Sequence, residues 1–549
     1  MGLLAPVPTV GIVVAVQGKS SILGHGSPIT ANYQWNFGDS SSQYNTLTGF
    51  NASHVYNNPG TYTITLTVTN DLHKVSTVSA QITISADYRS QIYVDSVNGS
   101  DSNNGSSPSD AVKTAARADQ LLRSNTEVLF DRGEEFDTTT TFLTPYSNVL
   151  IGAYGTGANP IINWDTNVSG VIFSNSSGSS IGVTFQDLTI DTENHADPGA
   201  SWLPQAIVPR GTNIDINDVQ FLSVDYDINA NSAPTGLMVT NCTSPLSNGL
   251  SAYFLWNESI DSVILGNTVV NSIHEHIIRT SGASQELIAY NNFTNNDGKG
   301  CIEVHEGSYA WVQGNTVTNG DIRVGPLGLW GEPVTEITQY AVIQGNTVNN
   351  VSINVDPGSD DISIRNNVIL RNEGMMIDVA STDSIGHTSG DIQILNNTGI
   401  SDGTNGNFLK VEDHTLGIIL ANNLMIAPNL VVGENGSAPV YTYENNLSSF
   451  TFIGGNVWPS PDILGFADGG INFAGVTFTS AGYFTPAAWN AQSVVANDIF
   501  SNVAVSSGYA PSSSSVAASA GSAIAGVFFD FDGNTIPSSG SISAGAIQV

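Results

Sequence analysis

The 549-residue sequence is poor in basic residues: 14 lysines and arginines stand against 48 aspartates and glutamates, giving a formal net charge of −34. A surface with this balance repels the phosphates of nucleic acids and the headgroups of anionic membranes, so neither is expected as a partner. The sequence also lacks any apolar run that approaches the ~20 residues of a membrane-spanning helix. We therefore expect no membrane insertion.

Cysteine is nearly absent, with Cys242 and Cys301 in different parts of the chain. A disulfide between them is not expected, and each is interpreted as a small buried side chain. Charged residues make up only 11% of the sequence, so the exterior must consist mainly of uncharged polar residues, as is common in extracellular and virion-surface β-proteins. The first eight residues lack the basic region and the long apolar core of a secretory signal. We expect an extracellular, cell-surface or virion-surface protein, either exported with a signal since removed or released without one.

A short sequence motif with a central asparagine is repeated between about residues 186 and 446. Three of its copies have the sequence Gly-Asn-Thr-Val. Successive copies are separated by 20 to 31 residues, and a period of this length that tolerates insertions is typical of a solenoid. The asparagines that define the repeat are Asn217, Asn241, Asn267, Asn291, Asn315, Asn346, Asn366, Asn396, Asn422 and Asn445.

A unit this short cannot bury its apolar face alone, so copies must stack on one another. The units are rich in Asn, Thr, Val and Ile and poor in helix formers, which argues against helical repeats. The sequence therefore predicts a right-handed parallel β-helix. Each asparagine is expected at a corner with left-handed backbone, hydrogen-bonded to the asparagine of the next coil ~4.8 Å away.

Residues 1–87 are predicted to form a β-sandwich, because Thr61 to Thr69 alternates as a strand with one buried and one wet face. The segments Tyr33-Gln-Trp-Asn-Phe-Gly-Asp39 and His54-Val-Tyr-Asn-Asn-Pro-Gly60 resemble the two signature motifs of the PKD family, although Asn36 replaces the usual Asp. The resemblance implies an immunoglobulin-like spacer or adhesion module without catalytic activity. Asp39 is expected to cap a turn.

A second family pattern begins at Ile92. A strand and a Gly-rich loop precede a short amphipathic helix at residues 111–122, which resembles the opening of pectate-lyase-like β-helix proteins. There the helix covers the open edge of the first coil. We expect the β-helix and its cap to occupy residues 88–460, and residues 461–549 to form terminal coils and a C-terminal cap. The predicted fold class is thus all-β.

Five strand segments of the repeat share one pattern, in which two apolar residues flank a polar one. The apolar residues are expected to point inward and the polar residue outward. In pectate-lyase-like proteins, such a face binds long glycans. The outward residues, which are predicted to form a polar column, are Glu303, Arg323, Asn354, Asp378 and Lys410.

The densest group of ionisable residues lies at 272–282 and 299–307, and it contains three of the nine histidines. It resembles the central coils of β-helix polysaccharide lyases, where Arg or Lys acts as the base. The catalytic candidates are His276, Arg279, Glu303 and His305. The candidates for substrate binding are Glu275, Lys299 and four members of the polar column, Arg323, Asn354, Asp378 and Lys410.

Two chemistries suit this group. In β-elimination from a uronic acid, Arg279 or Lys299 would neutralise the carboxylate, His276 or His305 would act as base, and an acid or Tyr309 would donate a proton. In hydrolysis, two carboxyl groups such as Glu275 and Glu303 would act as a pair. The alternative is that all of these residues form solvated ion pairs without a catalytic role.

No metal or other cofactor is predicted. His274 and His276 share a strand face, but the sequence offers no clear third ligand. Ca²⁺ stays open as a cofactor, although no motif supports it. Strand alternation from His274 to Arg279 leaves open which of these side chains point inward, because a bulge would change the pattern.

Three functions remain. The chain is an extracellular or surface-exposed protein that binds a polysaccharide and, as a lyase or hydrolase, cleaves it. Alternatively it is a phage virion protein, a tailspike or capsid decoration, that binds host glycans as a homotrimer or larger assembly. The third interpretation is a non-catalytic structural or adhesive surface protein.

Overall fold

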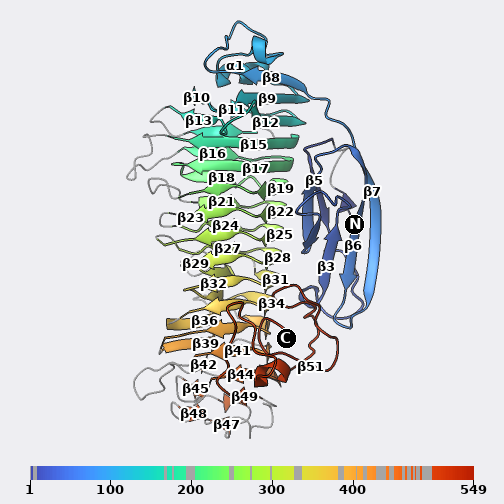
Figure 1. Cartoon of the computed structure of the whole chain (residues 1–549), viewed down its shortest axis with the longest axis vertical. Coiled ribbons are helices and arrows are strands. Elements are labelled where there is room, and N and C mark those ends of the chain that lie inside the picture. The colour runs from blue at the N-terminus through green and yellow to red at the C-terminus, as the bar shows by residue number, and fades with distance from the viewer. Residues whose placement is uncertain are drawn as a thin grey trace. The chain divides into compact units, whose positions relative to one another are not determined.

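The structure is a computed structural model of the chain (Figure 1). It describes residues 2–3, 9–165, 170–175, 178–192, 204–245, 253–272, 275–296, 299–326, 337–371, 373–380, 389–403, 405–411, 417–427, 441–443, 450–459, 464–466, 472–473, 476–477, 482–484 and 498–549. Two compact units share the chain. The first comprises Met1–Ser21, Tyr33–Thr67 and Thr77–Gly300, and the second comprises Ile22–Asn32, Val68–Ser76 and Cys301–Val549.

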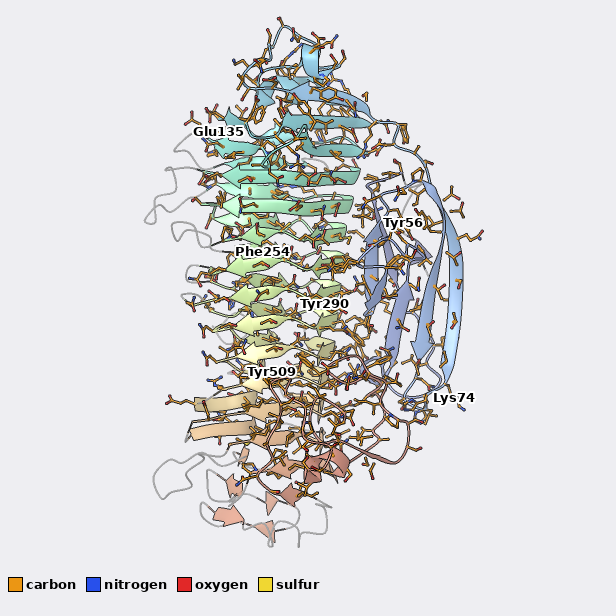
Figure 2. The ribbon with its side chains drawn as sticks, in the orientation of Figure 1. Tyr56, Lys74, Glu135, Phe254, Tyr290 and Tyr509 are labelled. Carbon is orange, nitrogen blue, oxygen red and sulfur yellow. The ribbon has the colours of Figure 1, made fainter. Side chains whose placement is uncertain are left out.

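The N-terminal domain is a sandwich of two antiparallel sheets. One sheet has the order β1 (Gly2–Leu3), β2 (Val13–Gln17), β5 (Asn51–Val55), and the other has the order β4 (Thr46–Thr48), β3 (Asn32–Asn36), β6 (Gly60–Thr69), β7 (Val75–Ile84). The aromatic residues of the two motifs form its core. Trp35 is fully buried and its ring nitrogen donates to the Gly49 carbonyl at 3.0 Å. Tyr56, labelled in Figure 2, donates to the Phe37 carbonyl at 2.8 Å. The predicted sandwich is confirmed.

Asp39 caps the turn after β3, as the sequence predicted. Its Oδ1 accepts hydrogen bonds from the backbone nitrogen and the hydroxyl of Ser41, at 3.2 and 2.6 Å. Its Oδ2 lies 3.1 Å from Nε2 of the buried His54. Burial alone would raise the pKa of Asp39, but the hydrogen bonds from Ser41 and His54 outweigh it, so the net pKa is lowered.

The solenoid begins with the expected cap. Strand β8 (Ser90–Val94) pairs in parallel with β9 (Thr126–Asp131), and helix α1 (Ala115–Leu121) lies between them in sequence and covers the first coil (Figure 1). The Thr114 hydroxyl caps α1 by accepting from the Arg117 nitrogen at 3.1 Å. Short 3-10 turns lie at Pro28–Thr30 (η1), Pro108–Asp110 (η2) and Val516–Ser519 (η4). No helix among the described residues has the length and apolarity needed to cross a membrane.

The coils after the cap are built from two parallel sheets. The fold is therefore a right-handed parallel β-helix, as predicted. One sheet has 26 strands and the other has 12, so each coil contributes strands to both walls. In the first unit, the 12-stranded sheet contains β11 (Phe142–Leu143), β14 (Val171–Ser174), β16 (Gln205–Val208), β18 (Tyr226–Ala230), β21 (Tyr253–Asn257) and β24 (Ile278–Ser281). In the second unit it contains β27 (Ile302–His305), β30 (Ile322–Val324), β33 (Ile353–Val355), β36 (Glu373–Val379), β39 (Asn405–Val411) and β42 (Tyr441–Tyr443).

The 26-stranded sheet supplies the other walls. Besides β8 and β9, its strands in the first unit are β10 (Glu135–Thr138), β12 (Val149–Tyr154), β13 (Ile161–Trp164), β15 (Ile181–Asp191), β17 (Thr212–Leu222), β19 (Thr235–Thr240), β20 (Thr243–Ser244), β22 (Ile260–Leu265), β23 (Thr268–Val270), β25 (Ser284–Ala289) and β26 (Asn292–Thr294). Its strands in the second unit are β28 (Ser308–Gln313), β29 (Thr316–Thr318), β31 (Thr338–Gln344), β32 (Thr347–Asn349), β34 (Ser359–Arg365), β35 (Val368–Leu370), β37 (Gly390–Leu395), β38 (Thr398–Ile400), β40 (Ile418–Ala421), β41 (Leu424–Ile426), β43 (Phe450–Gly454), β44 (Val457–Trp458) and β49 (Ile499–Phe500).

The interior between these walls is apolar and closely filled. Phe254, labelled in Figure 2, is buried between Phe221 and Phe293, with ring centroids 6.2 and 6.3 Å away. Cys242 and Cys301 are both buried and free, as predicted.

A ladder of buried asparagines runs along one corner of the coils. In the second unit each side-chain amide donates to the amide oxygen of the next coil, from Asn315 to Asn346 at 3.0 Å and so on to Asn456, which donates to Asp498 at 2.9 Å. The intermediate members are Asn367, Asn397 and Asn423. In the first unit, Asn267 donates to Asn291 at 2.9 Å. Stacking therefore satisfies amides that would otherwise be buried without partners.

Four of the repeat asparagines do not occupy this buried ladder. Asn241, Asn366, Asn396 and Asn422 precede it by one position and adopt left-handed backbone, with φ of 55°, 55°, 54° and 55°. The predicted pairing of left-handed asparagines does occur there, because Asn422 donates to Asn396 at 3.2 Å. The ladder and the left-handed residue are therefore two adjacent positions, whereas the sequence analysis combined them in one. Where the repeat reads Gly-Asn, the glycine takes the left-handed position. The asparagine that follows it then lies in the ladder, as the sequence predicted. Asn445 lies outside the described residues.

The outer face of the 26-stranded sheet is covered rather than wet in the first unit. Strands β2 and β5 of the sandwich pack against β17, β19, β22 and β25. The Thr184 hydroxyl donates to the Gly11 carbonyl at 2.8 Å, and Asn51 donates to the Ser262 carbonyl at 2.9 Å. Val263 on β22, a strand that packs against β5, is fully buried.

The C-terminal residues of the second unit run back along earlier coils. Gly545 donates to the Asn422 carbonyl at 2.7 Å, and Ala546 donates to the Thr398 hydroxyl at 2.8 Å. Three antiparallel pairs occur after β44: β45 (Leu464–Phe466) with β48 (Gly482–Phe484), β46 (Asn472–Phe473) with β47 (Val476–Thr477), and β50 (Gly521–Ser522) with β51 (Ser541–Ile542).

Candidate functional site

The polar column is present in the strand register of the second unit. Glu303 pairs with Arg323, Arg323 with Asn354, Asn354 with Asp378, and Asp378 with Lys410. The flanking residues Ile302 and Val304 are fully buried, as expected for inward positions. Arg323, Asn354, Asp378 and Lys410 are partly exposed. The predicted register of the column is thus confirmed, four of its five residues are partly exposed, and their role in binding remains a prediction.

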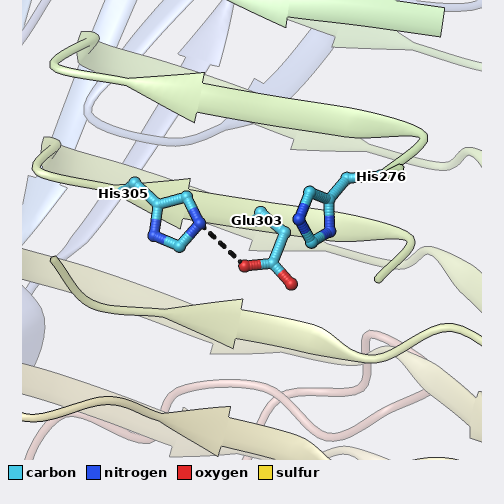
Figure 3. A group of neighbouring side chains, drawn as sticks. All are labelled: His276, Glu303 and His305. Atoms are coloured by element: carbon cyan, nitrogen blue, oxygen red, sulfur yellow. Dashed lines mark ion pairs between the residues drawn. The ribbon is translucent and has the colours of Figure 1, made fainter. Parts of the chain in front are cut away.

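Glu303 departs from the expected open position, because its side chain is only 2% exposed. The carboxylate lies 2.9 Å from Nε2 of His305, which is also buried, and Figure 3 shows this ion pair. His305 Nδ1 lies 2.8 Å from the Gly325 carbonyl. A carbonyl can only accept, so Nδ1 donates to Gly325. His305 thus links the Glu303 side chain to the Gly325 backbone.

Arg323 is the charge centre of this cluster. Its Nη2 lies 2.9 Å from Asp321, its Nη1 lies 3.3 Å from Asp356, and its Nε lies 3.5 Å from Glu303. Burial would lower the pKa of Arg323, but these three carboxyl groups raise it further above its usual range, so the guanidinium stays charged. One cation thus faces three acids.

Asp356 is the acid of this cluster that sequence reasoning missed. It is 4% exposed, and its Oδ2 has no hydrogen-bond partner among the described residues. Burial raises the pKa of Asp356 to about 7, although the charge of Arg323 opposes the shift. Asp356 directly follows β33, so in sequence it resembles an ordinary loop residue and gives no signal of its own. A carboxyl group that is protonated near neutral pH can serve as a proton donor.

The first unit carries its own cluster beside β21 and β24. Lys299 Nζ lies 2.9 Å from Glu275 Oε2. Burial would raise the pKa of Glu275, but the hydrogen bonds from Lys299 and Tyr253 outweigh it and the net pKa is lowered. Arg279 points outward from β24, and its guanidinium lies 4.6 Å from the centre of the Trp256 ring. Its Nη1 donates to the Tyr253 hydroxyl at 3.2 Å.

Three aromatic residues complete this cluster, and the sequence analysis did not identify them. Tyr226 on β18 stacks on Tyr253 with centroids 5.1 Å apart, and Tyr253 meets Trp256 edge-on at 5.3 Å. The strand register sets Trp256 beside Arg279 and Tyr226 beside Tyr253. Tyr226 and Trp256 keep part of their surface exposed. We call Tyr226, Tyr253, Trp256 and Arg279 the aromatic platform.

The remaining residues of the sequence analysis are His276, His274 and Tyr309. The His276 ring is buried, and its Nδ1 accepts from the Gly300 nitrogen at 2.9 Å. His274 lies outside the described residues. Strand β24 begins only at Ile278, so alternation does not govern residues 275–277, and Arg279 is free to face outward. Tyr309 belongs to the 26-stranded sheet, where it stacks on Tyr340 at 4.8 Å, rather than to the face that carries β27.

A group of three acids in the first unit could hold a cation. Asp95, Asp131 and Glu134 each offer an oxygen, and these oxygens lie within 4.8 Å of one another. Asp95 already accepts backbone hydrogen bonds from Val97 and Asn98, and Glu134 accepts one from Ser96 at 2.7 Å. These contacts stabilise the loop after β8 without an ion, as loop carboxylates commonly do.

Comparison with known families identifies the N-terminal domain. Residues 6–84 match the model of the PKD domain. The segment is thus a PKD domain, in agreement with its two motifs. For the chain as a whole, no curated protein gives a sequence match.

Solved structures resemble the chain only distantly. The Dettilon tailspike protein aligns with a TM-score of 0.48 and 14% identity, over 66% of this chain and 70% of its own. PfbA, a surface adhesin of Streptococcus pneumoniae, aligns at 0.41 and 13%, over 60% of this chain and 88% of its own. A GH136 lacto-N-biosidase from Eubacterium ramulus aligns at 0.38 and 14%, over 66% and 67%. Function must therefore be argued from the site itself.

Proposed function

We propose that the protein binds a polysaccharide along the outer face of its 12-stranded sheet. The observation that carries the proposal is the register of the polar column, which repeats one polar side chain per strand from Glu303 to Lys410. Parallel strands are ~4.8 Å apart, so the column presents hydrogen-bonding groups at a regular interval to an extended ligand. Amide, guanidinium, ammonium and carboxylate groups together donate to and accept from sugar hydroxyls.

The charge of the chain agrees with this choice of ligand. A net charge of −34 disfavours nucleic acids and anionic membranes, whereas sugar hydroxyls are recognised by hydrogen bonds that need no net charge. Together with the uncharged polar exterior, a glycan ligand favours a place outside the cell, on a cell surface or on a virion.

The test is a binding measurement on two column variants. Asn354→Ala and Lys410→Ala should each weaken the affinity for a bound polysaccharide by about 5- to 10-fold, because each removes a donor from the face. Asn57→Ala and Lys74→Ala are matched controls, since both residues are exposed on the PKD domain. Unchanged affinity in the column variants would refute the proposal. Calorimetry or biolayer interferometry against a polysaccharide panel gives the readout.

Cleavage of the bound chain is a second candidate function, favoured by the shared contact of Asp356 and Glu303 with Arg323. Asp356 would give its proton to the glycosidic oxygen as the bond to the anomeric carbon breaks. A water molecule would add to that carbon and pass a proton to Glu303. Atoms balance, because one water is consumed and two hydroxyl groups form. The β-elimination alternative would leave an unsaturated product instead.

The alternative that the chain is a virion protein changes the expected oligomeric state but not the expected ligand. A tailspike or capsid decoration with this face would bind the same class of glycan, and three-fold assembly in solution would favour it. Light scattering on the purified chain distinguishes a homotrimer from a monomeric secreted or adhesive protein.

A further inference from the structure

Arg279 lacks an acidic partner among the described residues, unlike four other cations of the chain. Arg89, Arg132, Lys299 and Arg323 all lie within ion-pair distance of carboxyl groups. Around Arg279, in the part of the chain that the structure describes, no carboxylate lies that close, and its Nε is buried without an acceptor. Arg365 also lacks a carboxylate, but it donates to the carbonyls of Ile29 and Gly526 and to Gln344, whereas the buried Nε of Arg279 has no acceptor among the described residues.

Without a bound ligand, the Arg279 guanidinium is incompletely solvated, which costs free energy. The guanidinium lies over the Trp256 ring and makes one hydrogen bond, from Nη1 to the Tyr253 hydroxyl. A partly buried charge without a counter-ion loses hydration that a ring and one hydroxyl only partly replace. An anion that enters from solvent would complete its coordination, and a carboxylate is the group that a guanidinium binds best in bidentate form.

The aromatic platform indicates what carries that carboxylate. Tyr226 and Trp256 remain partly exposed on the same face as Arg279. Aromatic rings pack against the C–H surfaces of sugar rings, while the guanidinium fixes a charged substituent. Lys299 is a poorer site for an acidic sugar, because Glu275 already neutralises it at 2.9 Å.

We propose that the aromatic platform is a subsite for an acidic sugar, with Arg279 binding the sugar carboxylate and Trp256 and Tyr226 packing against its ring. This inference rests on the proposed function, since it specifies one sugar of the polysaccharide that the 12-stranded sheet binds. One cation serves one carboxylate, so the ligand carries a uronic or sialic acid residue at this position.

The experiment compares carboxylated and neutral forms of the same glycan. The probes are polygalacturonate, alginate and polysialic acid oligosaccharides, each beside its carboxyl-reduced counterpart, titrated into the full chain at one fixed salt concentration. At least one acidic probe should bind about 10- to 100-fold more tightly than its reduced form. The uronate and sialate arms identify the source of the carboxylate.

Variants then assign the preference to Arg279. Arg279→Gln should remove the difference between the acidic and the reduced probe, while Arg279→Lys should retain part of it because the charge remains. Lys113→Gln is the control, since it removes one exposed cation elsewhere in the first unit. Thermal unfolding of each variant shows whether it is folded.

The outcomes separate this inference from the proposed function. Equal binding of acidic and reduced probes, weakened by Asn354→Ala, overturns the acidic subsite and leaves polysaccharide binding intact. A preference for acidic probes that survives Arg279→Gln also overturns it. Absence of binding to every probe and to neutral polysaccharides contradicts both.

Discussion

Arg365 donates a hydrogen bond of 2.8 Å to the backbone carbonyl of Ile29, a residue 336 positions earlier in the chain. The same guanidinium donates to the Gly526 carbonyl at 2.6 Å and, through Nε, to Gln344 at 2.8 Å. It is fully buried, and burial lowers its pKa to about 9. Within the second unit, one side chain thus joins the tip of the PKD domain, a coil of the solenoid and the C-terminal segment.

Replacing this arginine should destabilise the second unit. Arg365→Met leaves the carbonyls of Ile29 and Gly526 buried without a donor, and we expect a loss of about 3–5 kcal/mol in the free energy of unfolding. The C-terminal segment should also become accessible to limited proteolysis under conditions where the native chain resists. Arg371→Met is the matched control, because Arg371 makes an exposed contact with the Glu373 carbonyl. Equal stability of the two variants would contradict the argument.

The asparagine ladder should be the most sensitive part of the coils. Asn367 is fully buried and donates to the Ile343 carbonyl at 2.9 Å and to Asn397 at 3.0 Å. Asn367→Ala removes both hydrogen bonds and also the Oδ1 that accepts from the Asn346 amide at 3.0 Å, so about 2–4 kcal/mol should be lost. Because coils interact mainly with their neighbours, faster amide exchange should be concentrated in the adjacent coils.

An asparagine pair outside the ladder provides the comparison. Asn350 is exposed, has left-handed backbone with φ 62° and donates to Asn319 at 3.2 Å. Asn350→Gly removes the side chain without backbone strain, so it should change stability by less than about 0.5 kcal/mol. A loss as large as that of Asn367→Ala would show that burial is not the cause.

Features of the fold that depend on local sequence patterns could be predicted, whereas those that depend on contacts between distant residues could not. The solenoid, the PKD domain and the polar column follow from local patterns, namely a period in the twenties, two motifs and apolar–polar–apolar triplets. The ladder was displaced by one position at Asn366, because both residues of an Asn-Asn pair fit the repeated motif. Only hydrogen bonds between coils show that Asn367 is the ladder member.

The missed site residues depend on contacts between coils. Tyr226, Tyr253 and Trp256 come from two strands of variable spacing, so no periodic signal aligns them. Asp356 looks like an ordinary loop residue in sequence, and its importance comes from burial beside Arg323. Val263 is fully buried on a strand that packs against the PKD domain, and the docking of a separate domain cannot be read from strand alternation.

Asp215 should make stability depend on pH. It is 3% exposed, pairs in register with Thr184 beneath the PKD domain, and burial raises its pKa to about 8. Below the unfolded pKa of ~3.9 both states are protonated and the contribution of Asp215 is intact. As pH rises toward about 8 the unfolded state releases its proton first, so the folded state loses stability, by an amount of the order of a few kcal/mol.

The check is chemical denaturation at several pH values. Asp215→Asn cannot ionise, so its advantage over the native chain should grow from pH 5 to pH 8. Asp101→Asn, which changes an exposed aspartate of the cap, should run parallel to the native curve. A constant difference between Asp215→Asn and the native chain would exclude the titration of Asp215 as the cause.

Asp356 gives the decisive test of cleavage. If it donates the proton, hydrolysis of a bound polysaccharide should fall as pH rises through about 7, where Asp356 ionises. Asp356→Asn should lower the rate by about 100-fold or more while changing affinity less than about 2-fold, since the carboxyl group acts on the bond rather than on the resting ligand. Reducing ends measure the reaction, and absorbance of unsaturated products reveals elimination. Asp532→Asn, in the exposed C-terminal segment, is the control. Activity that persists in Asp356→Asn, or that increases above pH 7, would assign the proton donor to another group.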